Sequence, residues 1–299
     1  MTNIYESNPD CLPHILNENN KLITKKLIEN TLLKFDIKHK VKNLCNFQNA
    51  FIHISYIKNI QLTEKLIKLV KEIEPINDMN KALPLQENSY EVLEFLGDAV
   101  IHAVIAEYLY LRYPDKDPGF LTKLRTKIEK GDTLNMLSRS LGFHEYAIIA
   151  RNIELAGGRV NNVNIMEDVF EAFIGALKLE TNFETCQKFI INLIDTKVDF
   201  ADLINTEDNY KELLMQYYHK NGYKTTPTYA LINTFDEKLG KGDKKKFEMI
   251  AKNPDGKAIG RGIAVSKIMA AQLAAKEALI KLGQINLNIA ESEDEFYEL

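Results

Sequence analysis

Apolar residues recur at three- and four-residue spacing from Leu32 to about Val198, which predicts helices almost throughout this part of the chain. One such series is Leu93, Leu96, Val100 and Val104. The segment 114–118, with two prolines and two aspartates, and the pair Gly157-Gly158 interrupt the pattern and predict loops. We therefore expect an all-α domain in this part of the chain.

After Asp199 the pattern changes. A helix over 208–221 is expected first, then three extended segments over 228–234, 244–251 and 257–264, and then a helix over 266–281. In the middle extended segment, Phe247, Met249 and Ala251 occupy alternate positions, as in a half-buried strand. The sequence Asn-Pro-Asp-Gly over 253–256 predicts a turn. The order α-β-β-β-α predicts a small α+β domain.

These patterns divide the chain into five parts. We expect a polar, Asn-rich and loosely ordered N-terminal extension over 1–30, an all-α domain over 31–200, a linker over 201–207, the α+β domain over 208–283 and an acidic tail over 284–299.

The charge is distributed unevenly. The whole chain has a net charge of −4, but residues 208–281 contain 14 Lys and Arg against 8 Asp and Glu. A basic C-terminal domain fits a polyanionic partner, although a solvated surface would explain the charge equally well. The three cysteines are too few and too scattered for a disulfide framework or a zinc site, so we expect free thiols and an intracellular location, cytoplasmic rather than nuclear. No apolar stretch is long enough to span a membrane, and we expect no membrane partner.

Two predicted helices carry acids on an apolar background. Glu91, Glu94 and Asp98 are spaced three and four apart, so they share one face of the first helix. Asp168 and Glu171 are three apart in the second. Unpaired buried carboxylates are costly, and a hard cation such as Mg²⁺ would compensate them. Glu91 has an alternative, in which it forms a capping box with Asn88 at the start of the helix.

The segment 93–100, Leu-Glu-Phe-Leu-Gly-Asp-Ala-Val, resembles the characteristic motif of the ribonuclease III family. Three further segments resemble family motifs in the same order: Ala50–Tyr56, Gly119–Arg125 and Glu167–Leu179. The resemblance implies an all-α ribonuclease III nuclease domain.

The resemblance also implies roles for individual residues. Glu94, Asp98, Asp168 and Glu171 match the family's metal-binding carboxylates, among which Asp98 and Glu171 would be the catalytic pair and Glu171 the most direct ligand. Glu91 matches an accessory acid, and Phe95 matches an aromatic residue of the dimer interface. The implied activity is hydrolysis of double-stranded RNA by a homodimer with Mg²⁺, or with Mn²⁺ as a substitute, leaving 5′-phosphate and 3′-hydroxyl ends.

Two features depart from the family pattern. The 34 residues between Tyr56 and Glu91 exceed the usual number, so we interpret 57–84 as an insertion that contains a helix. Ile54 replaces the usual arginine of the segment that contains it. Neither feature involves the four carboxylates.

The segment Gly260–Ala275 resembles the last strand and helix of the double-stranded-RNA-binding domain. Such domains contact 2′-hydroxyls in two minor grooves and the phosphates between them. The resemblance implies RNA contacts from Gln216, Lys241, Lys244, Lys245, Lys246 and Lys267. Ile268 and Ala271 replace two usual lysines, and Lys241 and Asp243 replace a usual Pro and His. We therefore expect weaker RNA binding with little sequence preference.

Two readings compete with the active nuclease. A catalytically inactive RNA-binding or scaffold protein could keep this fold, and a protein that sequesters small RNA duplexes would share most of its features. The intact set of four carboxylates favours the enzyme over the inactive protein, while the sequence does not separate sequestration of duplexes from RNA processing.

Overall fold

A computed structural model describes residues 9–59, 63–205, 209–239 and 242–285. The chain forms two compact units, Met1–Leu203 and Ile204–Leu299. The finer domain bounds expected from the sequence stay predictions. No helix in the described part of the chain combines the length and the apolar character that crossing a membrane requires.

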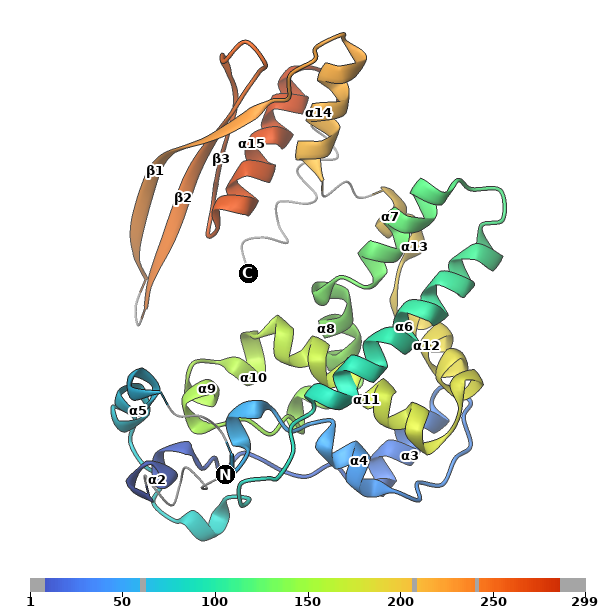
Figure 1. Ribbon diagram of the computed structural model, residues 1–299, viewed down its shortest axis with the longest axis vertical. Helices are drawn as coiled ribbons and strands as arrows, with labels where there is room; N and C mark the ends of the chain where they lie inside the picture. Colours follow the sequence, from blue (N-terminus) through green and yellow to red (C-terminus); the bar gives the residue numbers. More distant parts are fainter. Residues whose placement is uncertain (1–8, 60–62, 206–208, 240–241, 286–299) are drawn as a thin grey trace. The chain divides into compact units, whose positions relative to one another are not determined.

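The first unit is helical, as predicted, and Figure 1 shows its elements. They are η1 (Pro9–Cys11), α2 (Leu12–Ile15), α3 (Lys25–Leu33), α4 (Leu44–Asn49), η2 (Ile54–Tyr56), α5 (Glu64–Lys71), η3 (Met79–Lys81), α6 (Glu91–Arg112), α7 (Pro118–Ile128), α8 (Gly131–Ser140), η4 (Phe143–Glu145), α9 (Arg151–Leu155), α10 (Gly158–Asn161), α11 (Val163–Glu180), α12 (Phe183–Lys197) and α13 (Phe200–Asn205). The predicted loop at 114–118 is confirmed, because Asp117 caps α7 by accepting a hydrogen bond from the backbone N–H of Phe120.

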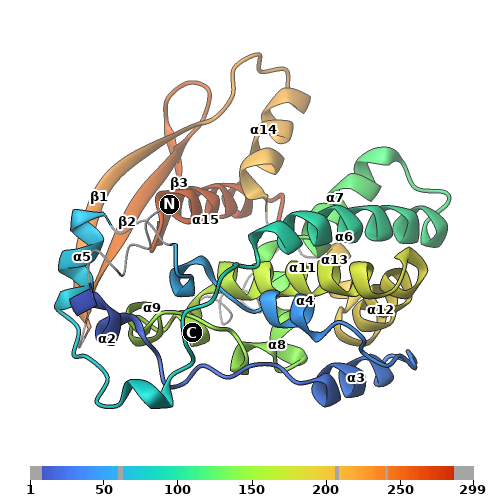
Figure 2. The same ribbon diagram turned by 60° about the horizontal axis from the view of Figure 1, so that its bottom comes forward.

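Helix α11 lies at the centre of the core. Phe173 is fully buried, and its ring contacts those of Phe47, Phe143 and Phe189 at centroid distances of 5.4, 4.6 and 5.8 Å. Figures 1 and 2 both show α6 directly beside α11. A helix that is apolar on nearly every side can be stable only when it is surrounded by other elements, and α11 meets this condition.

Glycines let the two long helices approach closely. A Cβ atom at Gly97 of α6 would overlap the backbone carbonyl of Glu171 on α11. A Cβ atom at Gly175 of α11 would overlap the backbone carbonyl of Leu93 on α6. The helix backbones are therefore in direct contact where the acidic residues lie.

The N-terminal segment is integrated into the first unit. Our expectation of a loosely ordered extension over 1–30 does not hold for the described residues, because Cys11, Ile15 and Leu16 are buried in a second small core. Helix α5 joins this core through Val70, so the insertion contains a helix as predicted. The Asn-rich composition misled the prediction, since the side chains of Asn17 and Asn20 are buried and hydrogen-bonded.

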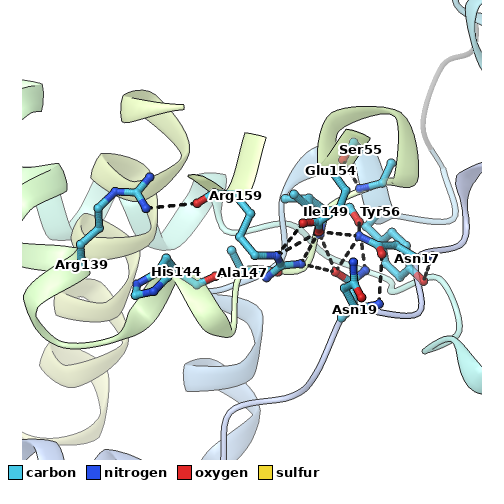
Figure 3. Close-up of polar contacts among 12 residues, drawn as sticks. Asn17, Asn19, Ser55, Tyr56, Arg139, His144, Ala147, Ile149, Glu154 and Arg159 are labelled. Atoms are coloured by element: carbon cyan, nitrogen blue, oxygen red, sulfur yellow. Dashed lines mark hydrogen bonds and ion pairs between the residues drawn. The ribbon is translucent and has the colours of Figure 1, made fainter. Parts of the chain in front are cut away.

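Figure 3 shows this buried polar network. Asn17 Nδ2 donates to Glu154 Oε2 at 2.9 Å and to the carbonyl of Ile149 at 3.1 Å. Arg159 forms an ion pair with Glu154 at 2.7 Å, and its guanidinium also donates to the carbonyl of Ala147 at 2.7 Å. The network joins the N-terminal segment to the turns that precede α11.

The second unit has the predicted α-β-β-β-α order, with α14 (Tyr210–Lys220), β1 (Thr228–Leu239), β2 (Gly242–Lys252), β3 (Ala258–Ala264) and α15 (Lys267–Lys281). The strands form one antiparallel sheet in the order β1-β2-β3. Ala270, Ala274 and Ala278, spaced four apart on α15, are fully buried. Gly260 of β3 lies so close to α15 that a Cβ atom there would overlap the carbonyl of Ala274. Small residues on both elements thus let the helix lie directly on the sheet.

Candidate functional site

Three acidic side chains converge between α6 and α11. One carboxylate oxygen each from Glu94, Asp168 and Glu171 lie within 4.8 Å of one another. Glu94 comes from the first turn of α6, and the other two come from one face of α11. Glu171 exposes only 9% of its surface, although it is charged in water. These distances suit oxygen ligands around one cation.

The fourth predicted carboxylate, Asp98, is exposed and is not in this group. It follows Glu94 by one turn of α6, and its negative charge still contributes to raising the pKa of Glu171 after the larger effect of burial. Asp98 therefore lies beside the three converging carboxylates.

Glu91 is the first residue of α6 and is exposed. The alternative in which it forms a capping box with Asn88 is wrong, because Tyr90 is the N-cap residue and no side chain caps this helix. Instead, Ser89 Oγ donates a hydrogen bond of 2.9 Å to Glu91 Oε2. A capping box would need Glu91 two positions further into the helix.

The site is electrostatically strained without a cation. Burial, and then the charges of Asp168 and Glu91, raise the pKa of Glu94 to about 7. Burial, and then the charge of Asp98, raise the pKa of Glu171 to about 8. Burial also raises the pKa of Asp168. Like charges that are close together and poorly hydrated favour the protonated forms.

No lysine, arginine or histidine in the described part of the chain forms an ion pair with Glu94, Asp168 or Glu171. Among the residues that the structure describes, these carboxylates thus have no positive partner. Three hard oxygen donors, one of them nearly buried, fit a divalent cation. The cluster can therefore hold a metal ion.

Two residues at this site were not anticipated. The hydroxyl of Tyr90 donates a hydrogen bond of 2.7 Å to Asp168 Oδ2, and the Tyr90 side chain is buried. Glu167 is half-buried, and burial followed by the charge of Asp168 raises its pKa. A Cβ atom at Gly131 of α8 would lie 2.5 Å from its carboxylate. Neither contact has a signal in the local sequence, because each joins distant segments.

The predicted RNA-binding residues of the second unit are at its surface where they are described. Gln216 on α14, Lys245 on β2 and Lys267 at the start of α15 are exposed, and Lys246 is half-buried. Ser266 caps α15 by accepting from the N–H of Met269, and Lys267 Nζ lies 5.7 Å from the ring centroid of Phe247. Lys241 and the side chain of Lys244 lie outside the described residues.

The predicted interface residue Phe95 exposes 81% of its surface on α6, as does Val92 three residues before it. Large apolar side chains exposed together on one helix face are typical of a contact surface.

Comparison with known proteins agrees with both units. Residues 91–182 match the model of the Ribonuclease III domain, and residues 210–282 match that of the Double-stranded RNA binding motif. The chain is 33% identical to "Ribonuclease 3" of Streptococcus gordonii, over 80% of this chain and 90% of that protein. The chain belongs to the ribonuclease III family. As a member of this family, the protein is an endoribonuclease that acts on double-stranded RNA. Its second unit is the double-stranded-RNA-binding domain.

Two further relatives and one solved structure are also similar to this chain. "Ribonuclease 3" of Borreliella burgdorferi is 30% identical over 82% of this chain and 96% of that protein. "Probable ribonuclease 3" of Acanthamoeba polyphaga mimivirus is 36% identical over 88% of this chain, which spans about half of that protein's length, 46%. Among solved structures, the nuclease domain of ribonuclease III from Campylobacter jejuni matches with 25% identity and a TM-score of 0.45, over 58% of this chain and 95% of that one.

Proposed function

We propose that this ribonuclease III family member hydrolyses duplex RNA with Mg²⁺ held by Glu94, Asp168 and Glu171. The convergence of three carboxylates that pair with no described lysine, arginine or histidine carries the proposal. Mg²⁺ prefers oxygen ligands and keeps several waters, and Mn²⁺ is expected to substitute for it. The expected products have 5′-phosphate and 3′-hydroxyl ends.

A divalent cation in this position would acidify a water molecule and stabilise negative charge on phosphate oxygens. The protein supplies ligands whose protons leave when the cation binds, since the pKa values of Glu94 and Glu171 are raised to about 7 and 8. Glu171 is the least exposed of the three. Asp98 is exposed beside them, where its carboxylate can orient water at the edge of the site, with Glu91 as an accessory acid one turn before Glu94.

We further propose that two copies form a homodimer through Phe95. Its exposed ring and the exposed aliphatic side chain of Val92, three residues before it, favour burial against a second copy. Phe95→Glu should yield monomers in analytical ultracentrifugation, because a charge in an apolar interface is poorly tolerated. Tyr110→Glu, a change at another exposed position of α6, is the matched control and should leave a dimer. A dimer that persists in the Phe95 variant would contradict the proposal that Phe95 lies in the dimer interface.

The second unit binds duplex RNA, and we propose that Gln216, Lys245, Lys246 and Lys267 contact it, together with Lys241 and Lys244. Support comes from the exposure of Gln216 and Lys267 and from the position of Lys267 at the N-terminus of α15, where the helix dipole also attracts phosphate. The cytoplasmic location stays a prediction from the sequence.

The direct test is cleavage of a labelled RNA duplex with and without Mg²⁺. The wild type should cut the duplex only with Mg²⁺, and Glu171→Gln should bind RNA without cutting. Glu184→Gln, which changes an exposed acid on α12, is the control and should cut normally. A wild-type protein that binds RNA but never cuts it would favour the inactive scaffold. Equal cleavage by Glu171→Gln and the wild type would contradict the assignment of the metal site.

A further inference from the structure

Tyr90 connects the two helices that carry the acidic cluster. Its hydroxyl donates to Asp168 Oδ2 on α11 at 2.7 Å. Its backbone carbonyl accepts from the N–H of Glu94 on α6 at 2.9 Å. Tyr90 therefore contacts Asp168 through its side chain and Glu94 through its backbone.

Tyr90 is itself held firmly. Its side chain is 3% exposed, and its backbone N–H donates to the carbonyl of Ile52 at 2.8 Å. The ring of His53 meets its ring edge-on, with centroids 5.8 Å apart. A buried ring that is fixed on two sides can hold its hydroxyl in one position.

His53 is in turn held in place by contacts with Ser55. His53 Nδ1 lies 2.8 Å from Ser55 Oγ and 3.1 Å from the Ser55 backbone nitrogen. Ser55 Oγ in turn accepts from the N–H of Ala150 at 3.0 Å. The segment Ala50–Tyr56, for which the sequence suggested no chemistry, thus forms the support for Tyr90.

We infer that Tyr90 is a positioning residue that holds the Asp168 carboxylate in the orientation needed to bind a divalent cation. This inference rests on the proposed function. Three carboxylates within 4.8 Å repel one another when ionised, so Asp168 would turn away unless something held it. A hydrogen bond from the Tyr90 hydroxyl opposes this rotation and needs no change when the cation binds. Residues that orient metal ligands commonly affect metal affinity about 10- to 100-fold.

Tyr90→Phe removes the hydroxyl and keeps the ring. Tyr108→Phe is a matched control, since Tyr108 is a second buried tyrosine associated with α6, and its hydroxyl donates to Asp195, away from the cluster. Mn²⁺ is titrated calorimetrically into the full chain without RNA. Wild type and Tyr108→Phe should bind alike, and Tyr90→Phe should bind about 10-fold more weakly. Equal Mn²⁺ affinity of Tyr90→Phe and wild type would overturn the inference.

Cleavage kinetics separate positioning from a general loss of structure. Tyr90→Phe should need about 10-fold more Mg²⁺ for half-maximal cleavage but reach the wild-type kcat at saturating Mg²⁺. A lower kcat that added Mg²⁺ does not restore would contradict the positioning role. Should Tyr90→Phe fail to fold, His53→Gln, which removes the ring beside Tyr90, is titrated instead, and unchanged Mn²⁺ affinity would overturn the inference.

The two hypotheses fail in different ways. Wild type that binds no Mn²⁺ and cuts no RNA would contradict the proposed function. Wild type that binds and cuts, beside a Tyr90→Phe variant with the same Mn²⁺ affinity, would contradict only the role of Tyr90.

Discussion

Gly97 of α6 lies directly against the backbone carbonyl of Glu171 on α11, with no room for a side chain between them. The same contact brings the carboxylates of Asp168 and Glu171 on α11 toward that of Glu94 on α6. The glycine in the acidic motif is therefore a requirement of helix packing. Its absence of a side chain determines how closely the two sets of acids approach.

Gly97→Ala should destabilise the protein and weaken metal binding. Alanine favours a helix by about 1 kcal/mol over glycine, so any loss of stability must come from the contact with α11. Overpacking of this kind costs about 1–3 kcal/mol. Gly119→Ala is the control, because a Cβ atom there would meet only the side-chain oxygen Oδ1 of Asp117, at 2.9 Å, and not the backbone of another helix. Urea unfolding of both variants checks the prediction, and equal midpoints would contradict it.

The metal-free protein should become less stable as pH rises. The pKa values of Glu94 and Glu171 are raised to about 7 and 8 by burial and then by neighbouring acids, above the ordinary value of 4.5. The folded state therefore binds these protons more tightly than the unfolded chain, and the stability that they provide is lost between about pH 4.5 and pH 8. A bound cation replaces the protons, so Mg²⁺ should raise Tm more at pH 8.5 than at pH 6.

Thermal unfolding in EDTA and in Mg²⁺ at the two pH values measures this effect. The double variant Glu94→Gln, Glu171→Gln is the control for other titrating groups and should lose less Tm between pH 6 and pH 8.5 in EDTA. A wild-type Tm in EDTA that changes no more than that of the double variant would contradict the assignment of the raised pKa values.

Arg159→Ala should lower the free energy of unfolding by about 3 kcal/mol, because it leaves the largely buried carboxylate of Glu154 without its cationic partner and with only the hydrogen bond from Asn17. Arg159 and Glu154 side chains are only 12% and 16% exposed. Lys21→Ala is the control, since Lys21 pairs with Glu145 at the surface and such pairs contribute about 0–1 kcal/mol. Urea denaturation compares the two, and similar small losses would show that the network in Figure 3 is unimportant for stability.

Lys267→Ala should weaken duplex RNA binding about equally for all sequences and reduce the slope of log affinity against log salt by about one. Lys281→Ala at the other end of α15 is the control, because that lysine pairs with Glu277. The affinity of each variant for duplex RNA, measured across a series of salt concentrations, distinguishes Lys267→Ala from Lys281→Ala. An unchanged slope for the Lys267 variant would exclude a phosphate contact.

The helical domain and the α-β-β-β-α domain were predictable because apolar periodicity reports local structure. The acids Glu94, Asp168 and Glu171 were predictable as a group, since carboxylates on apolar helices need compensation. Their family roles remain predictions. The position of Asp98 outside the converging group depends on the rotation of α6, which spacing alone does not give.

Other features depend on long-range contacts. The hydrogen bond from Tyr90 to Asp168 joins residues 78 positions apart, and no local sequence pattern predicts it. Asn17 and Asn20 appeared to be surface residues because asparagine usually is, yet both are buried against the carbonyl of Ile149. Burial of polar residues becomes visible only when their distant partners are known.

The most direct test of the metal site is an anomalous diffraction measurement on crystals soaked in Mn²⁺. The account predicts an ion coordinated by the carboxylates of Glu94, Asp168 and Glu171, and no such ion in crystals of Glu171→Gln. An enzyme that cuts duplex RNA while Mn²⁺ binds elsewhere, or not at all, would contradict it.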